Sequence, residues 1–369
     1  MSTETAIFED VTATLDYSVG DCISTTHPAQ PLEPRSHFPK SSWANPGYNK
    51  DGTRGVPLTV AHRGFKAKYP ENTMCAFSHA VKVGAQGLEA DMHISKDGVV
   101  VISHDATLQR CYGVRKRIID CDWEYLSTLR TIKPPFEPMP RLLYLLQYIS
   151  VPERSHVWLL LDIKLDNDPE AIMRAIAKTV LSIPSVHRPW NERIILGCWA
   201  AKYFPLCHTY LPKYPVALIT YSLLYARKFL KVPNISFSIE LKALMGPGGA
   251  KFLADVKHSR RQIFVWTVNE ESLMRWSVRN EVDGVITDDP ELLRKISDGC
   301  EGDRLHYGGY ISNFHDSGDD GITVLQRVNV LVAAVILFVL GGVFAIVHPA
   351  DLKEFTEEPY EEYDRWEEL

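Results

Sequence analysis

Between Pro57 and about Gly299, short apolar runs alternate with longer stretches whose apolar residues recur at helical spacing. This alternation restricts the fold more than any other feature, because strands and helices in strict alternation produce a parallel sheet covered by helices. Eight runs read as buried strands. They are LTVAH (58–62), GLEADM (87–92), VWLLLDIK (157–164), RIILGCW (193–199), PVALIT (215–220), NISFSI (234–239), QIFVWTV (262–268) and DGVIT (283–287). Eight such units predict an α/β fold, the (β/α)8 TIM barrel, which carries its chemistry at the carboxyl ends of the strands.

One more apolar run, VVVI at 99–102, follows the second predicted strand after only a few residues, which include Asp97 and Gly98. So short a connection cannot contain a parallel crossover, but it suits a hairpin turn. We therefore expect this run to fold back antiparallel on the second strand as a β-hairpin extension of the barrel.

The two ends of the chain differ from the barrel region. Residues 1–55 contain five prolines and no sustained periodicity, which predicts a flexible arm. The barrel domain is expected at 56–299, and a polar linker at 300–327. Residues 348–369 hold nine acidic and two basic residues, and we expect them to form a solvated acidic tail.

Residues 328–347 are apolar, with Asn329 as their strongly polar member. About 20 residues of helix cover the roughly 30 Å hydrocarbon core of a bilayer, so we predict a single transmembrane helix. A buried core helix is the alternative, but core helices keep a polar face and this segment has none. The start of the chain does not resemble a secretory signal peptide. We therefore expect a C-terminal anchor in an intracellular membrane (endoplasmic reticulum, mitochondrial outer membrane or lipid droplet), with the barrel domain in the cytosol.

Composition excludes several other classes of protein. The formal net charge is −6, and most of the acidic excess lies in the tail. The barrel region lacks the basic stripe that nucleic acid requires, so no nucleic-acid partner is expected. The seven cysteines include no C-x-x-C pair, which argues against a zinc site or a disulfide framework.

Charged side chains and histidines gather at the predicted carboxyl ends of the first three strands. Residues two apart lie on the same face of a strand, and the hairpin would return a histidine to the second strand. One rim of the barrel would therefore collect His62, Arg63, Glu89, Asp91, His104, Asp162 and Lys164.

Three carboxylates a few ångströms apart cannot all stay ionised unless a cation lies among them. Ligation by oxygen alone suits one divalent cation, Mg²⁺ or Ca²⁺, with Glu89, Asp91 and Asp162 as the candidate ligands. Arg63 and Lys164 would add the positive charge that a phosphate needs. Histidines beside them can donate and accept protons near neutral pH. Together these groups indicate metal-assisted cleavage of a phosphodiester.

Simpler explanations exist for several of these residues. A single histidine in a barrel loop is usually a structural residue, and Glu89 and Asp91 alone would fit an exposed strand. Glu71 and Asn72 suit the first turn and the cap of a helix better than catalysis, and Thr73 is the alternative cap of the same helix. Trp199 and Trp266, near strand ends, line a pocket or pack beneath helices, and the sequence does not decide between these two roles.

The ordered motifs of the chain resemble those of the glycerophosphodiester phosphodiesterase family. These motifs are HRGFKAKYPENTMCAF (62–77), LEADMHISKDGVVVISHD (88–105), LLLDIK (159–164), WTVN (266–269) and DGVITDDP (283–290). The resemblance implies that His62 and His104 are the catalytic acid and base. It also implies that Glu89, Asp91 and Asp162 bind the metal ion, and that Arg63 and Lys164 contact the phosphate.

Asp162 departs from the family pattern, because most members have glutamate there. This aspartate, the wording HRGFKA-YPENT and the C-terminal apolar segment resemble the fungal phosphatidylglycerol phospholipase C branch. That branch implies a membrane-anchored enzyme that converts phosphatidylglycerol to diacylglycerol and glycerol 3-phosphate. The alternatives are a phosphodiesterase acting on deacylated headgroups, a lysophospholipase D, and a membrane-tethered binding module without activity.

Overall fold

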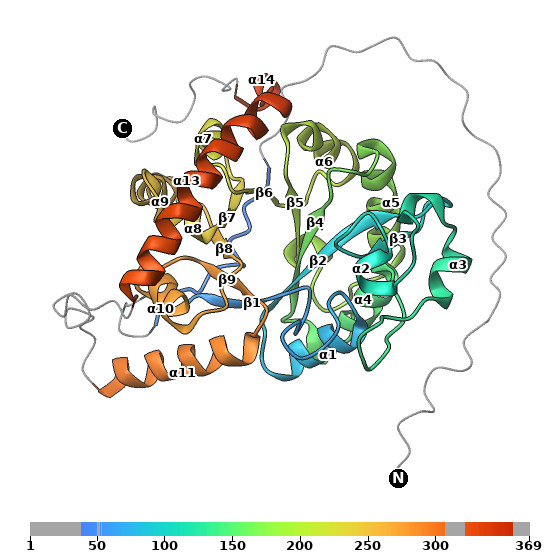
Figure 1. Cartoon of the computed structure of the whole chain (residues 1–369), viewed down its shortest axis with the longest axis horizontal. Coiled ribbons are helices and arrows are strands. Elements are labelled where there is room, and N and C mark those ends of the chain that lie inside the picture. Colours follow the sequence, from blue (N-terminus) through green and yellow to red (C-terminus); the bar gives the residue numbers. More distant parts are fainter. Residues whose placement is uncertain (1–37, 50–51, 53, 307–321, 357–369) are drawn as a thin grey trace, which may run out of the picture. The chain divides into compact units, whose positions relative to one another are not determined.

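The computed structural model of the chain describes residues 38–49, 52, 54–306 and 322–356 (Figure 1). Residues 1–37 of the predicted arm, 307–321 of the predicted linker and 357–369 of the predicted acidic tail lie outside the described residues.

Eight parallel strands form a closed barrel, as the sequence predicts (Figure 1). The strands are β1 Leu58–His62, β2 Gly87–Ile94, β4 Trp158–Ile163, β5 Ile194–Cys198, β6 Val216–Thr220, β7 Ser236–Glu240, β8 Ile263–Trp266 and β9 Gly284–Thr287. Strand β1 closes the barrel because it pairs in parallel with both β2 and β9. Every strand begins and ends within two residues of the run predicted for it, and β2 extends two residues further than predicted, to Ile94.

The predicted hairpin is also present. Strand β3 Val100–Ile102 pairs antiparallel with β2, and Ile102 lies opposite Met92. The turn includes Gly98, whose φ of +84° is a conformation that glycine adopts without strain. After β3 the backbone N–H of Ser103 donates to the carbonyl oxygen of Asp91 (3.0 Å). The next residue, His104, is thereby returned to the carboxyl end of β2.

Helices follow the strands and cover the outside of the barrel (Figure 1). They are α1 Met74–Lys82, α2 Gln109–Tyr112, α3 Trp123–Thr128, α4 Leu142–Ile149, α5 Pro169–Ser182, α6 Phe204–Tyr210, α7 Leu223–Lys228, α8 Leu241–Met245, α9 Gly249–His258, α10 Glu271–Arg279, α11 Pro290–His306, α13 Val324–Val347 and α14 Lys353–Thr356. Helix α11 continues beyond residue 299, where the barrel domain was expected to end. Side-chain caps fix some of the starts: Thr73 accepts a hydrogen bond from the N–H of Ala76, and Asp168 accepts one from Ala171.

Strand side chains alternate between two apolar layers, because successive residues of a strand point to opposite faces. In β4, Leu159 and Leu161 belong to the layer between strands and helices, whereas Leu160 belongs to the layer inside the barrel. The inner layer contains Val60, Trp158, Leu160, Ile195, Ala217, Phe264 and Ile286. The interior is therefore a packed core at its amino end, which leaves the carboxyl end for polar groups.

Part of the predicted flexible arm is instead packed against the barrel, which corrects that prediction for the described residues before 56. Ala44 is fully buried and joins the inner layer, and the ring of Trp43 lies 5.8 Å from that of Trp158. Buried Ser41 hydrogen-bonds the hydroxyl of Ser236 at 2.7 Å, at the start of β7. The sequence did not predict this contact, because the segment packs on the barrel through a few isolated side chains and has no periodic pattern.

The C-terminal apolar helix is α13 Val324–Val347, which starts four residues before the predicted segment 328–347. By length and composition it could cross a membrane, and only 22% of its most apolar 18-residue window is buried. A stripe consisting of Val330, Ala334, Gly341 and Phe344 is buried, whereas most of its other apolar side chains are exposed. Helix α13 contacts α7 and α8 of the barrel (Figure 1).

The chain continues along the barrel surface after α13. Leu352 and Phe355 are each 7% exposed, so the start of the predicted solvated tail is buried. The ring of Phe355 stacks on Phe38 at 5.2 Å and lies 6.2 Å from Phe204 of α6. The expectation of a solvated tail is therefore wrong for these residues, because their apolar side chains cover a gap between the N-terminal segment and α6.

Candidate active site

The predicted site residues meet at the carboxyl end of the barrel. A pocket of about 110 Å³ opens there. Among the predicted site residues, its lining includes His62, Arg63, Glu89, His104, Asp162, Lys164, Trp199 and Trp266. The ninth predicted residue, Asp91, is fully buried and ion-paired to Lys164. The structure thus brings all nine residues together, and it decides that the two tryptophans line the pocket.

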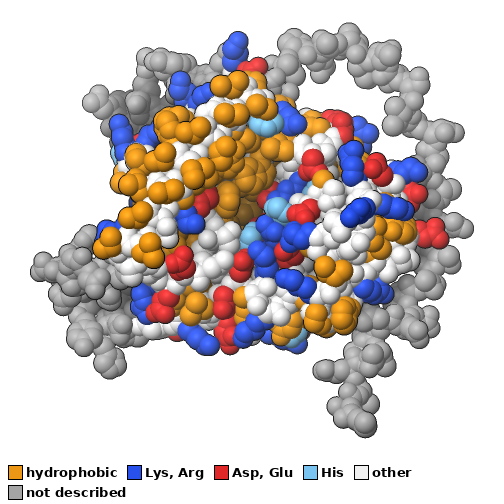
Figure 2. All heavy atoms as spheres, in the orientation of Figure 1, with side chains coloured by type: hydrophobic (Ala, Val, Ile, Leu, Met, Phe, Trp, Pro, Cys, Tyr) orange, Lys and Arg blue, Asp and Glu red, His pale blue; other side chains and the backbone are white. Residues whose placement is uncertain are grey.

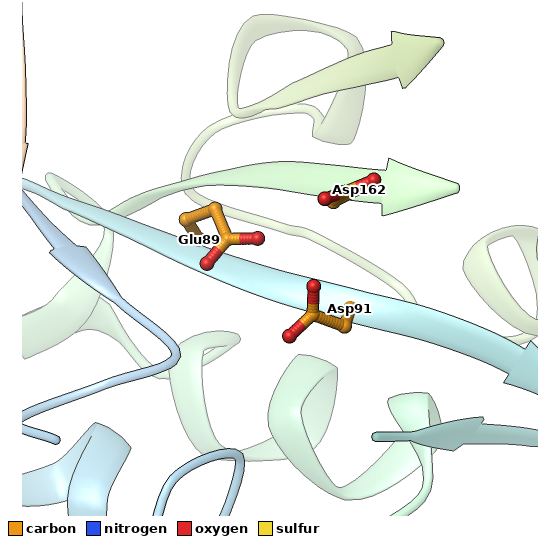
Figure 3. A group of neighbouring side chains, drawn as sticks. All are labelled: Glu89, Asp91 and Asp162. Carbon is orange, nitrogen blue, oxygen red and sulfur yellow. The ribbon is translucent and has the colours of Figure 1, made fainter. Parts of the chain in front are cut away.

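Three carboxylates from two neighbouring strands point toward one another (Figure 3). Glu89 and Asp91 lie two apart on β2, and the strand register places Asp162 of β4 directly beside Asp91. One oxygen from each carboxylate lies within 4.8 Å of the other two. The spacing of two along β2 and the pairing of β2 with β4 are therefore sufficient to build the cluster.

Two cationic side chains lie among these acids. The Nζ of Lys164 is 2.6 Å from Asp91 and 2.6 Å from Asp162, and the Nε of Arg63 is 3.2 Å from Asp91. Burial opposes the charge on Asp91, but Lys164 and Arg63 outweigh it and lower its pKa. Glu89 has the opposite balance, because burial and the neighbouring charges of Asp91 and Asp162 raise its pKa well above the usual value.

The three carboxylates fit the ligand set of a divalent cation. Three buried carboxylates share two basic side chains, so one negative charge remains uncompensated, and the raised pKa of Glu89 reflects it. Oxygen ligands at these separations suit Mg²⁺ or Ca²⁺, which bind carboxylates with water completing the shell. Burial and the neighbouring acids disfavour ionisation of Glu89, and a divalent cation among the three carboxylates would favour it.

His62, at the end of β1, is held by a carboxylate that the sequence reasoning missed. Its Nδ1 lies 2.6 Å from Oδ1 of Asp288, which follows β9. Asp288 is itself held by Asn269, whose Nδ2 donates to Oδ2 at 3.0 Å, and by Lys66 at 3.2 Å. Burial lowers the pKa of His62, although Asp288 opposes this effect. Burial opposes the charge on Asp288 too, but His62 and Lys66 outweigh it and lower its pKa to about 2.

His104 has a similar partner on the other side of the pocket. Its Nδ1 lies 2.7 Å from Oδ1 of Asp105, and Asp105 accepts two hydrogen bonds from Arg110 of α2. These bonds lower the pKa of Asp105 to about 2, and burial lowers the pKa of His104. In each pair the carboxylate binds Nδ1, so the Nε2 atom remains for the pocket.

Glu71 and Asn72 do not occupy the helix positions expected of them. Thr73 caps α1, and no acidic residue lies in its first turn. Asn72 donates from Nδ2 to Asp91 at 2.6 Å, and Glu71 accepts from both Arg63 and Arg110. Both residues precede the helix, and Asn72 has a φ of +55°, which is outside the helical range. They belong to the hydrogen-bond network around the site.

The remaining wall of the pocket is aromatic and apolar. The rings of Trp199, after β5, and Trp266, at the end of β8, lie 5.6 Å apart. The Nε1 of Trp199 donates to Oδ1 of Asp162 at 2.7 Å, so this tryptophan also orients one of the acids. Leu160, Ile219 and Ile286 add apolar surface to this side, and the small polar residues Ser238 and Thr267 complete the lining.

The sequence contained a signal for some of the missed residues. Asp105 directly follows His104, and Asp288 directly follows the last predicted strand, where barrel enzymes place functional groups. Asn269 carried the same signal, because it directly follows the predicted strand 262–268. Arg110 offered none, because it reaches the site through Asp105 and Glu71.

Comparison with known proteins adds a family to this geometry. Residues 62–292 match the model of the glycerophosphoryl diester phosphodiesterase family. A glycerophosphodiester phosphodiesterase of Bacillus altitudinis is 29% identical over 244 residues, which cover 64% of this chain and 96% of that protein. A lysophospholipase D of Mus musculus is 29% identical over 272 residues, which cover 64% of this chain and 84% of the relative.

Solved structures share the barrel. A glycerophosphodiester phosphodiesterase from Thermotoga maritima has a TM-score of 0.52 and 27% identity, and the match covers 65% of this chain and 98% of that one. A phosphodiesterase from Oleispira antarctica, solved in complex with the product sn-glycerol-3-phosphate, has a TM-score of 0.58 and 20% identity. Its match covers 66% of this chain and 97% of that protein, and it supports the fold.

Proposed function

Because this chain belongs to the glycerophosphoryl diester phosphodiesterase family, and is therefore a phosphoric diester hydrolase, we propose that its substrate is a glycerophospholipid. The proposed reaction converts phosphatidylglycerol to diacylglycerol and glycerol 3-phosphate, as in a phospholipase C. The resemblance of Asp162 and the HRGFKA-YPENT motif to the fungal phosphatidylglycerol phospholipase C branch supports this choice of substrate.

One observation carries the proposal. Two histidines, each paired to a carboxylate through Nδ1, line one small pocket together with Arg63, Lys164 and two of the clustered acids, Glu89 and Asp162. Phosphodiester cleavage needs a proton acceptor for the nucleophile, a proton donor for the leaving oxygen, and positive charge for the phosphate. The pocket supplies all three.

In the proposed mechanism, a headgroup hydroxyl one carbon from the phosphoester attacks phosphorus, and one histidine accepts its proton at Nε2. The other histidine donates a proton to the diacylglycerol oxygen as the P–O bond breaks. A cyclic glycerophosphate results, and water then opens it to glycerol 3-phosphate. His62 and His104 are the proposed pair, and Asp288 and Asp105 hold their rings in the required tautomer.

Glu89, Asp91 and Asp162 are the proposed ligands of one divalent cation, Mg²⁺ or Ca²⁺. Such a cation, when bound, supplies positive charge beside the phosphate and the attacking hydroxyl. Arg63 and Lys164 are the proposed phosphate contacts. Their ion pairs to Asp91 hold both side chains beside the acids, where their positive charge would balance the negative charge on the phosphoryl oxygens.

The proposed setting is a membrane surface. Helix α13 is the proposed anchor, because it presents apolar side chains such as Val332, Val339 and Ile346 to the outside. The expected membrane is intracellular (endoplasmic reticulum, mitochondrial outer membrane or lipid droplet), with the catalytic barrel in the cytosol. An anchored barrel would meet its substrate without extracting it completely from the lipid layer.

A second candidate is supported by the relatives. One is named a glycerophosphodiester phosphodiesterase and another a lysophospholipase D, so the chain could instead act on deacylated headgroups or release the headgroup alcohol. The products separate these reactions. Phospholipase C activity gives diacylglycerol, whereas lysophospholipase D activity leaves the phosphate on the lipid.

The test uses the purified full chain with phosphatidylglycerol in mixed micelles and, separately, with soluble glycerophosphoglycerol. We expect diacylglycerol and glycerol 3-phosphate from the lipid, dependence on added Mg²⁺ or Ca²⁺, and loss of turnover with EDTA. Phosphatidate as the lipid product would replace the proposal with the phospholipase D type of reaction. Turnover of the soluble diester alone would restrict the enzyme to deacylated headgroups.

A further inference from the structure

Helix α13 packs closely and specifically against the barrel. A Cβ atom added at Gly341 would lie 2.6 Å from Oγ of Ser222, and one added at Gly246 would lie 2.6 Å from Cβ of Ala334. Small residues at such positions let backbones approach closely, as they do between membrane helices. The ring of Phe344 lies 5.3 Å from that of Tyr225 in α7. The contact therefore has matched shapes along most of the helix.

Both ends of α13 are held on the barrel. Near its start, Nε2 of Gln326 donates to Glu270 at 2.6 Å and to Ser272 at 3.0 Å, beside α10. Beyond its end, Leu352 and Phe355 are buried, and Phe355 stacks on Phe38. A helix that crossed a bilayer would place its two flanks on opposite sides of the membrane. In the docked arrangement both flanks lie on the barrel. A docked α13 would therefore meet a membrane with its exposed face in one leaflet, rather than cross the bilayer as the sequence predicts.

A groove of about 350 Å³ lies between α13 and the barrel. Its lining includes Leu223 and Leu224 of α7, Ala243 of α8, Pro247, and Val335 and Phe338 of α13. Arg227 also lines it, but its charge is paired with Asp255 at 2.9 Å. The groove has the size of a small-ligand site, and an apolar molecule fits its lining.

The groove is adjacent to the catalytic pocket. Tyr221, which follows β6, lines the groove, and its ring lies 6.4 Å from Trp199, which lines the pocket. Tyr221 also contacts Phe344 of α13, with ring centroids 5.7 Å apart. Figure 2 shows apolar side chains extending from α13 into a hollow that borders the histidines and charged side chains at the centre of the view. Aromatic rings thus form a continuous apolar surface from the pocket to the groove.

We propose that the groove between α13, α7 and α8 binds an acyl chain of the lipid whose headgroup occupies the catalytic pocket. This inference rests on the proposed function, because it requires a substrate that carries acyl chains. The occupant follows from the aromatic rings of Trp199 and Tyr221, which lie side by side between the pocket and the groove, and from the exposed apolar face of α13, which suits a lipid surface. Helix α13 then has two roles, since it contacts the leaflet and forms one side of the substrate site.

Two variants and one matched control test the acyl-chain site in the full-length protein. Val335→Trp fills the groove from a half-exposed position, and Gly341→Leu forces α13 away from Ser222. Gly342→Leu is the control, because a side chain at the neighbouring residue would meet open space. All three variants and the wild type are assayed with phosphatidylglycerol in mixed micelles and with soluble glycerophosphoglycerol.

We expect Val335→Trp and Gly341→Leu to lower kcat/KM for phosphatidylglycerol by about tenfold or more, the loss expected when roughly two methylene groups lose apolar contact. Turnover of glycerophosphoglycerol should stay within about twofold, which also shows that the barrel is folded, and Gly342→Leu should change neither activity. Equal effects on both substrates in Val335→Trp, or no effect on the lipid, would overturn the assignment.

A binding experiment separates failure of the groove from failure of the proposed reaction. Vesicles contain phosphatidylglycerol with a photoreactive diazirine in one acyl chain, and labelled residues are identified by mass spectrometry. We expect labelling of Leu224 and Ala243 in the wild type and its loss in Val335→Trp, even if the wild type does not hydrolyse the lipid. Labelling confined to outward residues such as Val332 and Val339 would overturn the acyl-chain site and would favour a helix that contacts only the bilayer.

Discussion

The two halves of the barrel mouth differ in chemistry. The charged half is formed by His62, Arg63, Glu89, Asp162 and Lys164, where nearly every polar group is held by a partner of opposite charge. The aromatic half is formed by Trp199, Ile219 and Trp266, and it continues toward α13. A phospholipid has the same division, because its phosphate and headgroup are polar and the rest is apolar.

This difference predicts how strongly substitutions in each half should affect the reaction. Catalysis in the charged half depends on fixed distances between ionised groups, so single substitutions there should have large effects on rate. The aromatic half contributes contact area, which is spread over several side chains, so substitutions there should have smaller effects. Substitutions in the two halves therefore test this difference between catalysis and contact area.

Loss of a proposed proton-transfer group should have the largest effect. His62→Ala should reduce kcat by about 10²- to 10⁴-fold, the usual contribution of general acid–base catalysis. Stopped assays of glycerol 3-phosphate release measure this effect. His156→Ala is the control, because that histidine is exposed and lies before β4, outside the pocket lining. Full activity in His62→Ala would remove the central assignment of the charged half.

Loss of the partner of His62 should have an intermediate effect. Asp288→Asn should lower kcat by about 10²-fold at most, because the imidazole keeps its place but loses the carboxylate that orients it. Asp288 raises the pKa of His62, so the limb of the pH–rate profile that reports His62 should move to lower pH.

The neighbouring residue provides the control for this change. Asp289 accepts a hydrogen bond from the N–H of Leu292 at the start of α11, so Asp289→Asn should cost some stability and leave the pH profile unchanged. If the two variants shift the profile equally, Asp288 has no special role.

A smaller effect is expected where the aromatic half touches the acids. Trp199→Phe removes the Nε1 donor to Asp162 but keeps an aromatic ring. Partners of metal ligands typically change metal affinity by 10- to 100-fold, so the Mg²⁺ or Ca²⁺ concentration needed for half-maximal rate should rise by about tenfold. Maximal rate at saturating cation should change little.

Trp266→Phe is the matched control for this comparison. Within the described residues, Nε1 of Trp266 has no hydrogen-bond partner, so the same substitution removes no contact to an acid. Equal cation requirements in the two variants would mean that Trp199 acts only as apolar surface.

The smallest expected effect concerns the stability of the fold at low pH, to which Glu71 contributes. Burial would raise the pKa of Glu71, but Arg110 and Arg63 outweigh it and lower the pKa to about 2. Because the folded pKa lies below the unfolded value of 4.5, Glu71 stabilises the fold above pH 4.5, and this stabilisation disappears as the pH falls toward 2. It amounts to about 3 kcal/mol at most.

In Glu71→Gln, the free energy of unfolding should therefore fall less between pH 5 and pH 2 than in the wild type, as measured by urea denaturation. The exposed Glu124 provides the comparison, since Glu124→Gln should leave this pH dependence as it is. An unchanged pH dependence in Glu71→Gln would show that the network around Arg63 and Arg110 does not stabilise the fold.

The barrel, the hairpin and the seven polar site residues could all be predicted from the amino-acid sequence. Local patterns are sufficient for these features. The eight alternating strand and helix segments predict the barrel, the short connection at Asp97 and Gly98 predicts the hairpin, and a spacing of two places Glu89 and Asp91 on one face. Parallel pairing then brings the strand ends to one rim without further information.

Contacts between side chains that are distant in the sequence could be seen only in the folded structure. Asp288 reaches His62 because β9 pairs with β1 when the barrel closes, and no local pattern records that pairing. Apolar composition marked residues 328–347 as a segment that avoids water, but it could not say what covers them. The fit of Gly341 against Ser222 settles that one stripe of α13 lies on the barrel, because close packing depends on the shapes of both surfaces.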